Sequence, residues 1–151
     1  MNCKLSSKKL IMTLIVAGIT FSGVFMSTGK AEAAWSGWQT KGGYTVKVYT
    51  DASTYTSRAS SIKWRMKKKG SSKLYYKAYI CKWINRGLFS GGSVTGYFKV
   101  STPLKTYSVS PVRKKLGNGT YIVRVFLFKD AKKKKMIGSF DSKKIRITKG
   151  R

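Results

Sequence analysis

The sequence predicts a small antiparallel β-sandwich of seven or eight strands, formed by residues 34–151 after an export signal at residues 1–33. Apolar and polar residues alternate with a period of two in many short segments, whereas helical periodicity is almost absent. Turn signals rich in glycine separate these segments at regular spacing, which is typical of an all-β sandwich. Residues 34–151 are enough for one hydrophobic core and one domain.

The first segment has the three parts of an export signal. Its lysines are followed by the apolar run Leu10–Met26, and Ala31-Glu32-Ala33 fits the small-x-small cleavage pattern. An uncleaved membrane anchor is the alternative. The long, lysine-rich signal resembles those of Gram-positive exporters. We therefore expect a secreted protein, with retention on the cell envelope by charge as a further expectation.

The expected strands follow in chain order. Tyr44–Val48 alternates, and Ile62–Met66 is the cleanest half-buried strand. A longer strand runs from Leu74 to Trp83. Further strands are expected at 94–100, 104–109, 120–128, 136–140 and 145–147. Turn signals are expected at 69–72, 91–92, 117–119 and 130–131.

One short pattern sharpens the architecture. The stretch Leu116–Val125 has a leucine, a glycine turn and Tyr121 before an alternating strand. It resembles the tyrosine corner of fibronectin-type-III and immunoglobulin-like domains. The cysteine pair of true immunoglobulin domains is missing. The resemblance implies an immunoglobulin-like fold and says nothing about function.

The resemblance also implies which loops meet. Residues 62–66 and 74–83 would be strands B and C, and Tyr121 would open strand F. The BC and FG loops of such folds lie at the same end of the sandwich. This predicts a basic pole made of Lys67, Lys68, Lys69, Lys73, Lys129, Lys132, Lys133, Lys134 and Lys135. Arg113, Lys114 and Lys115 would lie at the opposite end.

Charge is the dominant feature of the composition. The chain holds 32 Lys and Arg against 4 Asp and Glu, with no histidine and a net charge of +28. Only Asp51, Asp130 and Asp141 supply side-chain carboxylates after the signal, so catalytic dyads, histidine triads and clustered metal ligands are disfavoured. Ser60 and Lys63 fit an S-x-x-K pattern without its supporting motifs. We expect no metal, no cofactor and no enzymatic activity; a Ser–Lys or Cys81 enzyme is the remote alternative.

A charge this large exceeds what solubility needs and costs self-repulsion, which indicates a polyanionic partner. Outside a cell the candidates are teichoic acid, anionic lipid, nucleic acid and sulfated glycan. The favoured interpretation is a cationic binder of anionic envelope or membrane surfaces, with an antimicrobial or cell-surface role. Alternatives are an extracellular nucleic-acid binder and an adhesion module that binds sulfated glycan.

Aromatic residues suggest a second contribution to binding. Tyr75, Tyr79 and Trp83 share one face of the 74–83 strand with a lysine, and such rings stack on bases or sugars or lie at lipid interfaces. The alternative is that this face packs against the opposite sheet. Cys81 is the single cysteine after the signal, so it is either a buried filler or a link between two chains. A monomer is expected, with a Cys81-linked dimer as the alternative.

Overall fold

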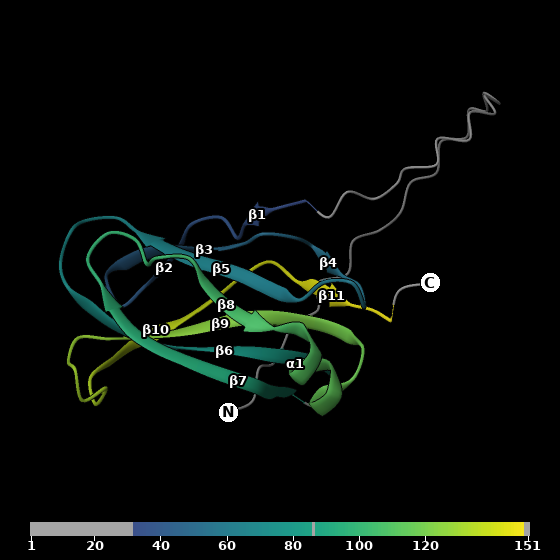
Figure 1. The fold of residues 1–151 in the computed structure, drawn as a ribbon. Coiled ribbons are helices and arrows are strands. Elements are labelled where there is room, and N and C mark those ends of the chain that lie inside the picture. The colour runs from purple at the N-terminus through teal and green to yellow at the C-terminus, as the bar shows by residue number, and fades with distance from the viewer. Residues whose placement is uncertain (1–31, 86, 150–151) are drawn as a thin grey trace, which may run out of the picture.

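The computed structural model describes residues 32–85 and 87–149, which form two β-sheets packed face to face (Figure 1). The predicted β-sandwich is confirmed. Among these residues no helix has the length and apolarity needed to span a membrane. The predicted export signal falls on residues 1–33, of which 1–31 lie outside the described residues.

The first sheet has the order β1-β3-β5-β8, with β2 paired to β3; the second has the order β4-β11-β9-β6-β7, with β10 paired to β9. Pairing is antiparallel except between β11 and β4, which are parallel. The strands are β1 Ala34–Trp35, β2 Gln39–Lys41, β3 Tyr44–Thr50, β4 Thr54–Tyr55, β5 Ser61–Lys68, β6 Leu74–Ile84, β7 Gly87–Phe98, β8 Lys105–Ser108, β9 Gly119–Phe128, β10 Met136–Asp141 and β11 Ile145–Ile147.

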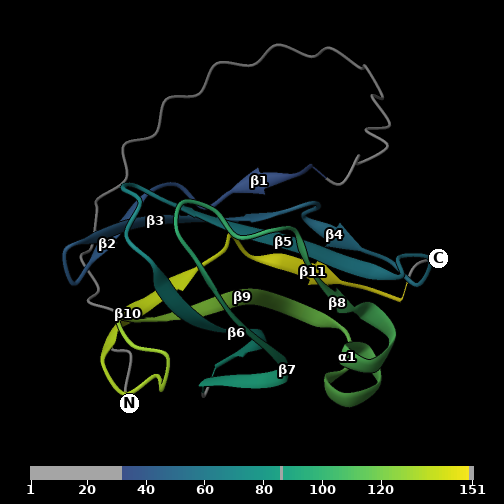
Figure 2. The same cartoon turned by 60° about the vertical axis from the view of Figure 1, so that its left-hand side comes forward.

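The core lies between the two sheets, and alternation decides which residues enter it. Trp64 is fully buried on β5, with its ring at 89° to the Tyr76 ring of β6 and nearly parallel to that of Tyr107. Figure 2 shows the β1, β3 and β5 layer above the β6, β7 and β9 layer. The outward positions of β5 and β6 are therefore free to carry polar or aromatic side chains on opposite faces of the molecule.

Strand pairing places the two predicted basic loops together. In the antiparallel β6–β9 pair Tyr75 lies opposite Phe128, so the loops at 69–73 and 129–135 leave the second sheet at the same end. Figure 1 shows α1, at Val109–Leu116, at the other end of the sandwich. The expected relation between the two loops, and the expected distance of Arg113–Lys115 from them, agree with this arrangement.

Two local expectations are wrong. The helix α1 begins at Val109, the last residue of the strand expected at 104–109, and continues through residues 110–116, for which no element was expected. Gly91 and Gly92 lie within β7 rather than in a turn, because β6 and β7 stay paired until Ile84 faces Gly87. A Cβ on Gly91 would lie 3.2 Å from Val112 of α1, so glycine here lets the helix approach the sheet.

The tyrosine corner is present. The Tyr121 hydroxyl donates to the Gly117 carbonyl oxygen at 2.5 Å, and the Tyr121 side chain is fully buried. Gly117 has φ 75°, a left-handed conformation that favours glycine. The bond therefore ties the end of α1 to the start of β9.

We expect Tyr121→Phe to lower the free energy of unfolding by about 1 kcal/mol or more, because it removes the hydroxyl and leaves the Gly117 carbonyl without this donor. Urea denaturation followed by far-ultraviolet dichroism would measure it. An unchanged midpoint would show that the corner does not stabilise the domain.

Candidate functional site

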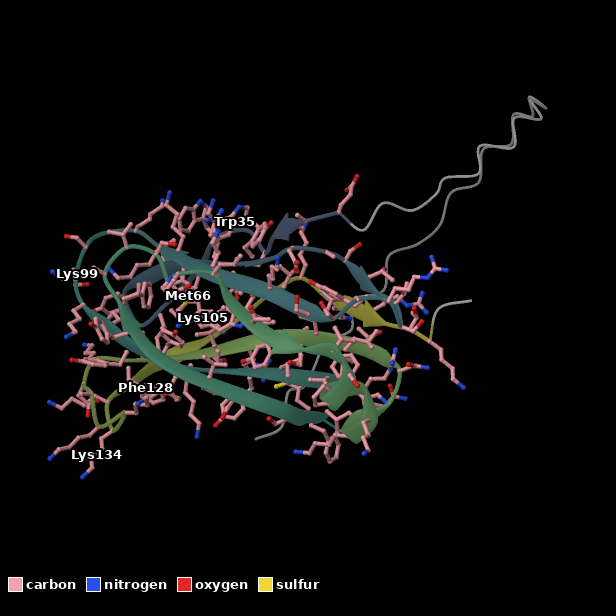
Figure 3. The ribbon with its side chains drawn as sticks, in the orientation of Figure 1. Trp35, Met66, Lys99, Lys105, Phe128 and Lys134 are labelled. Carbon is pink, nitrogen blue, oxygen red and sulfur yellow. The ribbon has the colours of Figure 1, made fainter. Side chains whose placement is uncertain are left out.

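The basic end is the end of the sandwich formed by the loops at 69–73, 99–104 and 129–135. Figure 3 shows Lys99 and Lys134 there, both pointing away from the body of the molecule. Lys129, Lys132, Lys134 and Lys135 are exposed, whereas Lys133 is half-buried. The lysines predicted for the FG loop therefore lie together on one loop.

Asp130 gives this loop its shape. Its carboxylate accepts the backbone N–H groups of Lys135 at 2.7 Å and Lys134 at 3.1 Å, and its carbonyl accepts that of Lys133. The N–H of Lys135, then that of Lys134, holds the pKa of this carboxyl below its ordinary value. Lys133 takes a left-handed φ of 55°, which is uncommon for a residue with a Cβ.

We expect Asp130→Ala to weaken polyanion binding even though it makes the protein more positive. The loop loses the acceptor that orders Lys134 and Lys135, so each lysine must be ordered again on binding. Titration with a fluorescent polyanion, with the melting midpoint as a folding control, would measure it. Stronger binding would show that net charge alone decides affinity. In the wild type the loop should keep its order at neutral pH and lose it only as pH falls through the lowered pKa.

A shallow hollow of about 380 Å³ lies beside this loop on the outer face of the second sheet. It is lined by Lys77, Tyr79, Phe126, Phe128 and Lys133. The Tyr79 and Phe126 rings meet edge to face at 5.8 Å, and the Lys77 ammonium lies 5.2 Å from the Tyr79 ring centre. Cations from a strand and from the FG loop thus share an aromatic floor.

The rings continue towards the basic end. Lys73 places its ammonium 4.3 Å from the centre of Tyr97 and 5.4 Å from that of Tyr75. Tyr97 is 62% exposed. The outer position of Tyr75 and Tyr79 follows from the inward position of Leu74, Tyr76, Ala78 and Ile80, so this face does not pack against the opposite sheet.

Trp83 does not join this group. It lies at the far end of β6, is 40% exposed and holds the Lys144 ammonium 4.5 Å from its ring centre. Cys81 is buried, and burial raises the pKa of its thiol to about 11. A buried thiol with a raised pKa is a poor nucleophile and agrees with the expected role as a filler.

The four lysines predicted near the BC loop divide among three places. Lys68 was predicted to lie on the basic pole, but it is buried. It is 2% exposed, and its ammonium donates to the Gly70 carbonyl at 2.9 Å. Burial lowers its pKa. Because β5 continues to this residue and its side chains alternate, Lys68 points inward on the same side as Trp64 and Met66. Lys67 and Lys69 accompany the first sheet, and only Lys73 accompanies the aromatic face of the second.

The carboxylates do not neutralise these lysines. Asp141 pairs with Arg124 at 2.7 Å, and Asp51 accepts the Tyr55 hydroxyl. Asp130 is engaged by the backbone of its own loop. Within residues 32–85 and 87–149 no group of three or more His, Cys, Asp or Glu side chains could hold a metal ion. The arrangement is suited to holding anions.

A second hollow, of about 610 Å³, lies at the end opposite the basic loops. Its lining includes Arg113, Lys149, Ser57 and Asn118. The Arg113 Nη1 atom is shielded from solvent and has no hydrogen-bond partner within the described chain. Sequence reasoning missed this juxtaposition, because α1 was not expected.

Comparison with known proteins places the fold in a family. The family model of the YqgA MG2 macroglobulin domain matches residues 31–148. The chain belongs to this family. YqgA MG2 macroglobulin domains have an immunoglobulin-like fold, which confirms the resemblance inferred from the tyrosine corner.

This chain is also similar to a protein of Bacillus subtilis (strain 168). It is the cell wall-binding protein YqgA, which is 37% identical to this chain over 112 residues. The match covers 72% of each chain. This similarity supports the expectation of association with the cell surface.

Proposed function

We propose that this chain is a secreted, non-enzymatic protein that binds anionic polymers of the cell wall, such as teichoic acid. The binding surface is the FG loop together with the aromatic outer face of the second sheet. The hollow at Lys77 and Lys133 carries the proposal, because lysines from two different elements line it together with Tyr79, Phe126 and Phe128. The Bacillus relative is named a cell wall-binding protein, and this name supports a target in the cell wall.

The mechanism is electrostatic accumulation followed by local contact. The exposed lysines of the FG loop attract the polymer, and salt screens this electrostatic attraction. The rings then supply apolar contact beside the bound anions while holding Lys73 and Lys77 by cation–π attraction. No carboxylate has to be displaced from these lysines, because Asp130 is held by the N–H groups of its own loop, Asp141 by Arg124 and Asp51 by the Tyr55 hydroxyl.

The direct test compares purified cell walls that retain their anionic polymer with walls from which it has been removed. At physiological salt the labelled protein should bind the first and bind the second only weakly. Equal binding to both would overturn the proposal and indicate recognition of the neutral glycan or peptide.

Nucleic acid is the second candidate, favoured by the exposed Tyr97 ring next to Lys73, which offers a stacking surface for a base. A competition panel separates the candidates: soluble wall polymer, single-stranded DNA, sulfated glycan and anionic vesicles against wall-bound protein. Wall polymer should compete best. Strong competition by vesicles, with leakage of their contents, would instead support a membrane-directed antimicrobial role.

A further inference from the structure

The outer face of the first sheet carries a second set of cations, ordered by aromatic rings. Lys47 places its ammonium 4.4 Å from the centre of the Trp35 ring and 4.7 Å from that of Trp38. Lys69 lies over Trp38 at 5.4 Å. Arg65 lies over both Trp35 and Tyr49, at 5.5 and 5.2 Å. We call this set the cation–aromatic row: Lys69, Trp38, Lys47, Trp35, Arg65 and Tyr49.

Strand pairing builds this row from distant parts of the sequence. β1 places Trp35 opposite Tyr49 of β3, and β3 places Tyr49 opposite Arg65 of β5. Cations and rings therefore alternate, and one ring separates each cation from the next. Figure 3 shows Trp35 on the side of the molecule away from Phe128 and Lys134.

The row contains a repulsion between like charges, which lowers the stability of the sheet and which selection for stability alone would not keep. Lys47 lies directly opposite Lys67 across the β3–β5 pair, and like charges in this position destabilise a sheet. Lys47, Arg65 and Lys69 make no ion pair within the described chain. Asp51, the nearest carboxylate in sequence to β3, accepts the Tyr55 hydroxyl and the Lys63 N–H. Glu32 belongs to the predicted export signal.

The chemistry of the row favours a repeating anion over a base or a sugar. Each indole already has two cations over it, so the rings do not offer a bare platform for stacking. They instead hold long, flexible side chains in place, which reduces the entropy lost when an anion binds. A line of cations separated by rings suits a linear polymer with one phosphate in each unit.

We propose that the cation–aromatic row is a second binding surface for a linear phosphate polymer, and that the protein bridges two polymer strands. The row and the hollow at Lys77 and Lys133 lie on the outer faces of opposite sheets, so one strand cannot cover both without wrapping around the sandwich. The bridging part rests on the proposed function, because it needs the surface on the second sheet. The row itself does not.

The first experiment measures binding of the full exported protein to linear inorganic polyphosphate. The row variant is Lys47→Gln with Arg65→Gln, and the matched control is Arg58→Gln with Lys63→Gln. Both remove one lysine and one arginine, but Arg58 and Lys63 are exposed and lie over no ring of the described residues. The row variant should bind about tenfold or more weakly, with little change in the control. Equal weakening would overturn the proposal in favour of a diffuse coat of charge.

A third variant keeps every charge, in case the double replacements disturb folding. Trp38→Leu removes the ring between Lys47 and Lys69, and Trp38 is 46% exposed outside the core. Affinity should fall although net charge is unchanged. Unchanged affinity, or displacement of polyphosphate by a neutral glycan, would contradict ordering of cations for phosphate.

Light scattering with long polyphosphate tests bridging. The wild type should raise scattering, whereas the row variant should bind through the second sheet without raising it. Lys77→Gln with Lys133→Gln should give the complementary result. If the row variant does not bind at all, the second-sheet surface fails while the row stands. If the wild type binds without scattering, bridging is wrong.

Discussion

Replacing Lys132, Lys133, Lys134 and Lys135 by glutamine should weaken binding to an anionic wall polymer by more than about tenfold and make it less sensitive to salt. These lysines belong to the loop that Asp130 orders, and Lys133 also lines the hollow of the second sheet. With duplex DNA as a calibrating probe, the slope of log affinity against log salt should fall by about 0.9 for each phosphate that the variant no longer neutralises. Equilibrium titration over a salt series measures both quantities.

A pair at the other end of the sandwich provides the control. Lys114→Gln with Lys115→Gln removes two charges from α1, as Lys133→Gln with Lys134→Gln removes two from the FG loop. Both pairs lie on the surface, where such changes usually alter stability by less than about 0.5 kcal/mol. The α1 pair should affect binding less. If it weakens binding as much, the basic end is not a distinct site, and the hollow beside Arg113 and Lys149 becomes the better candidate.

Much of the fold was open to prediction because alternation reports burial directly. Ile62–Met66 and Leu74–Trp83 lie in strands whose inward sets fill the core, and the Tyr121 pattern indicated how the FG loop lies relative to the BC loop. The same reasoning could have placed Lys68, since it continues the set of Trp64 and Met66. Lys68 was assigned to the surface because it belongs to a run of lysines, although its position in the alternation of the strand predicts that it faces inward.

Other features depend on pairing that one sequence does not reveal. The cation–aromatic row requires Trp35 to lie beside Tyr49 and Tyr49 beside Arg65, and each step is set by strand register. Phe126 reaches the hollow only because β9 pairs with β6. The helix α1 did leave signals, with Ser108 at its start, basic residues in its last turn and Gly117 after it. Its eight residues are too few for a clear period.

Gly96→Ala should lower the free energy of unfolding by about 2 kcal/mol, within the range for overpacked cores. Gly96 lies opposite Tyr76 in the β6–β7 pair, and a Cβ there would come within 2.6 Å of the Tyr76 hydroxyl and 2.8 Å of the ring. The ring cannot move aside easily, because Tyr76 is buried and its ring centre lies 5.9 Å from that of Trp64 and 6.1 Å from that of Phe98. The entropy that alanine removes from the unfolded chain offsets only about 0.4–1 kcal/mol.

Gly92→Ala, in the same strand, separates this clash from the general effect of the substitution. A Cβ on Gly92 would have only Tyr107 within reach, at 4.0 Å, which is ordinary contact. The free energy of unfolding of this variant should stay near that of the wild type or rise slightly, since alanine also favours the folded chain by restricting the unfolded one. Urea denaturation of the two variants gives the comparison.

Equal midpoints would contradict the prediction. They would mean that the Tyr76 ring can move away from Gly96 without cost, and that its close approach to the backbone does not stabilise the pairing of β6 with β7. A lower midpoint for Gly96→Ala alone would show that the close approach of the Tyr76 ring to Gly96 stabilises the β6–β7 pair.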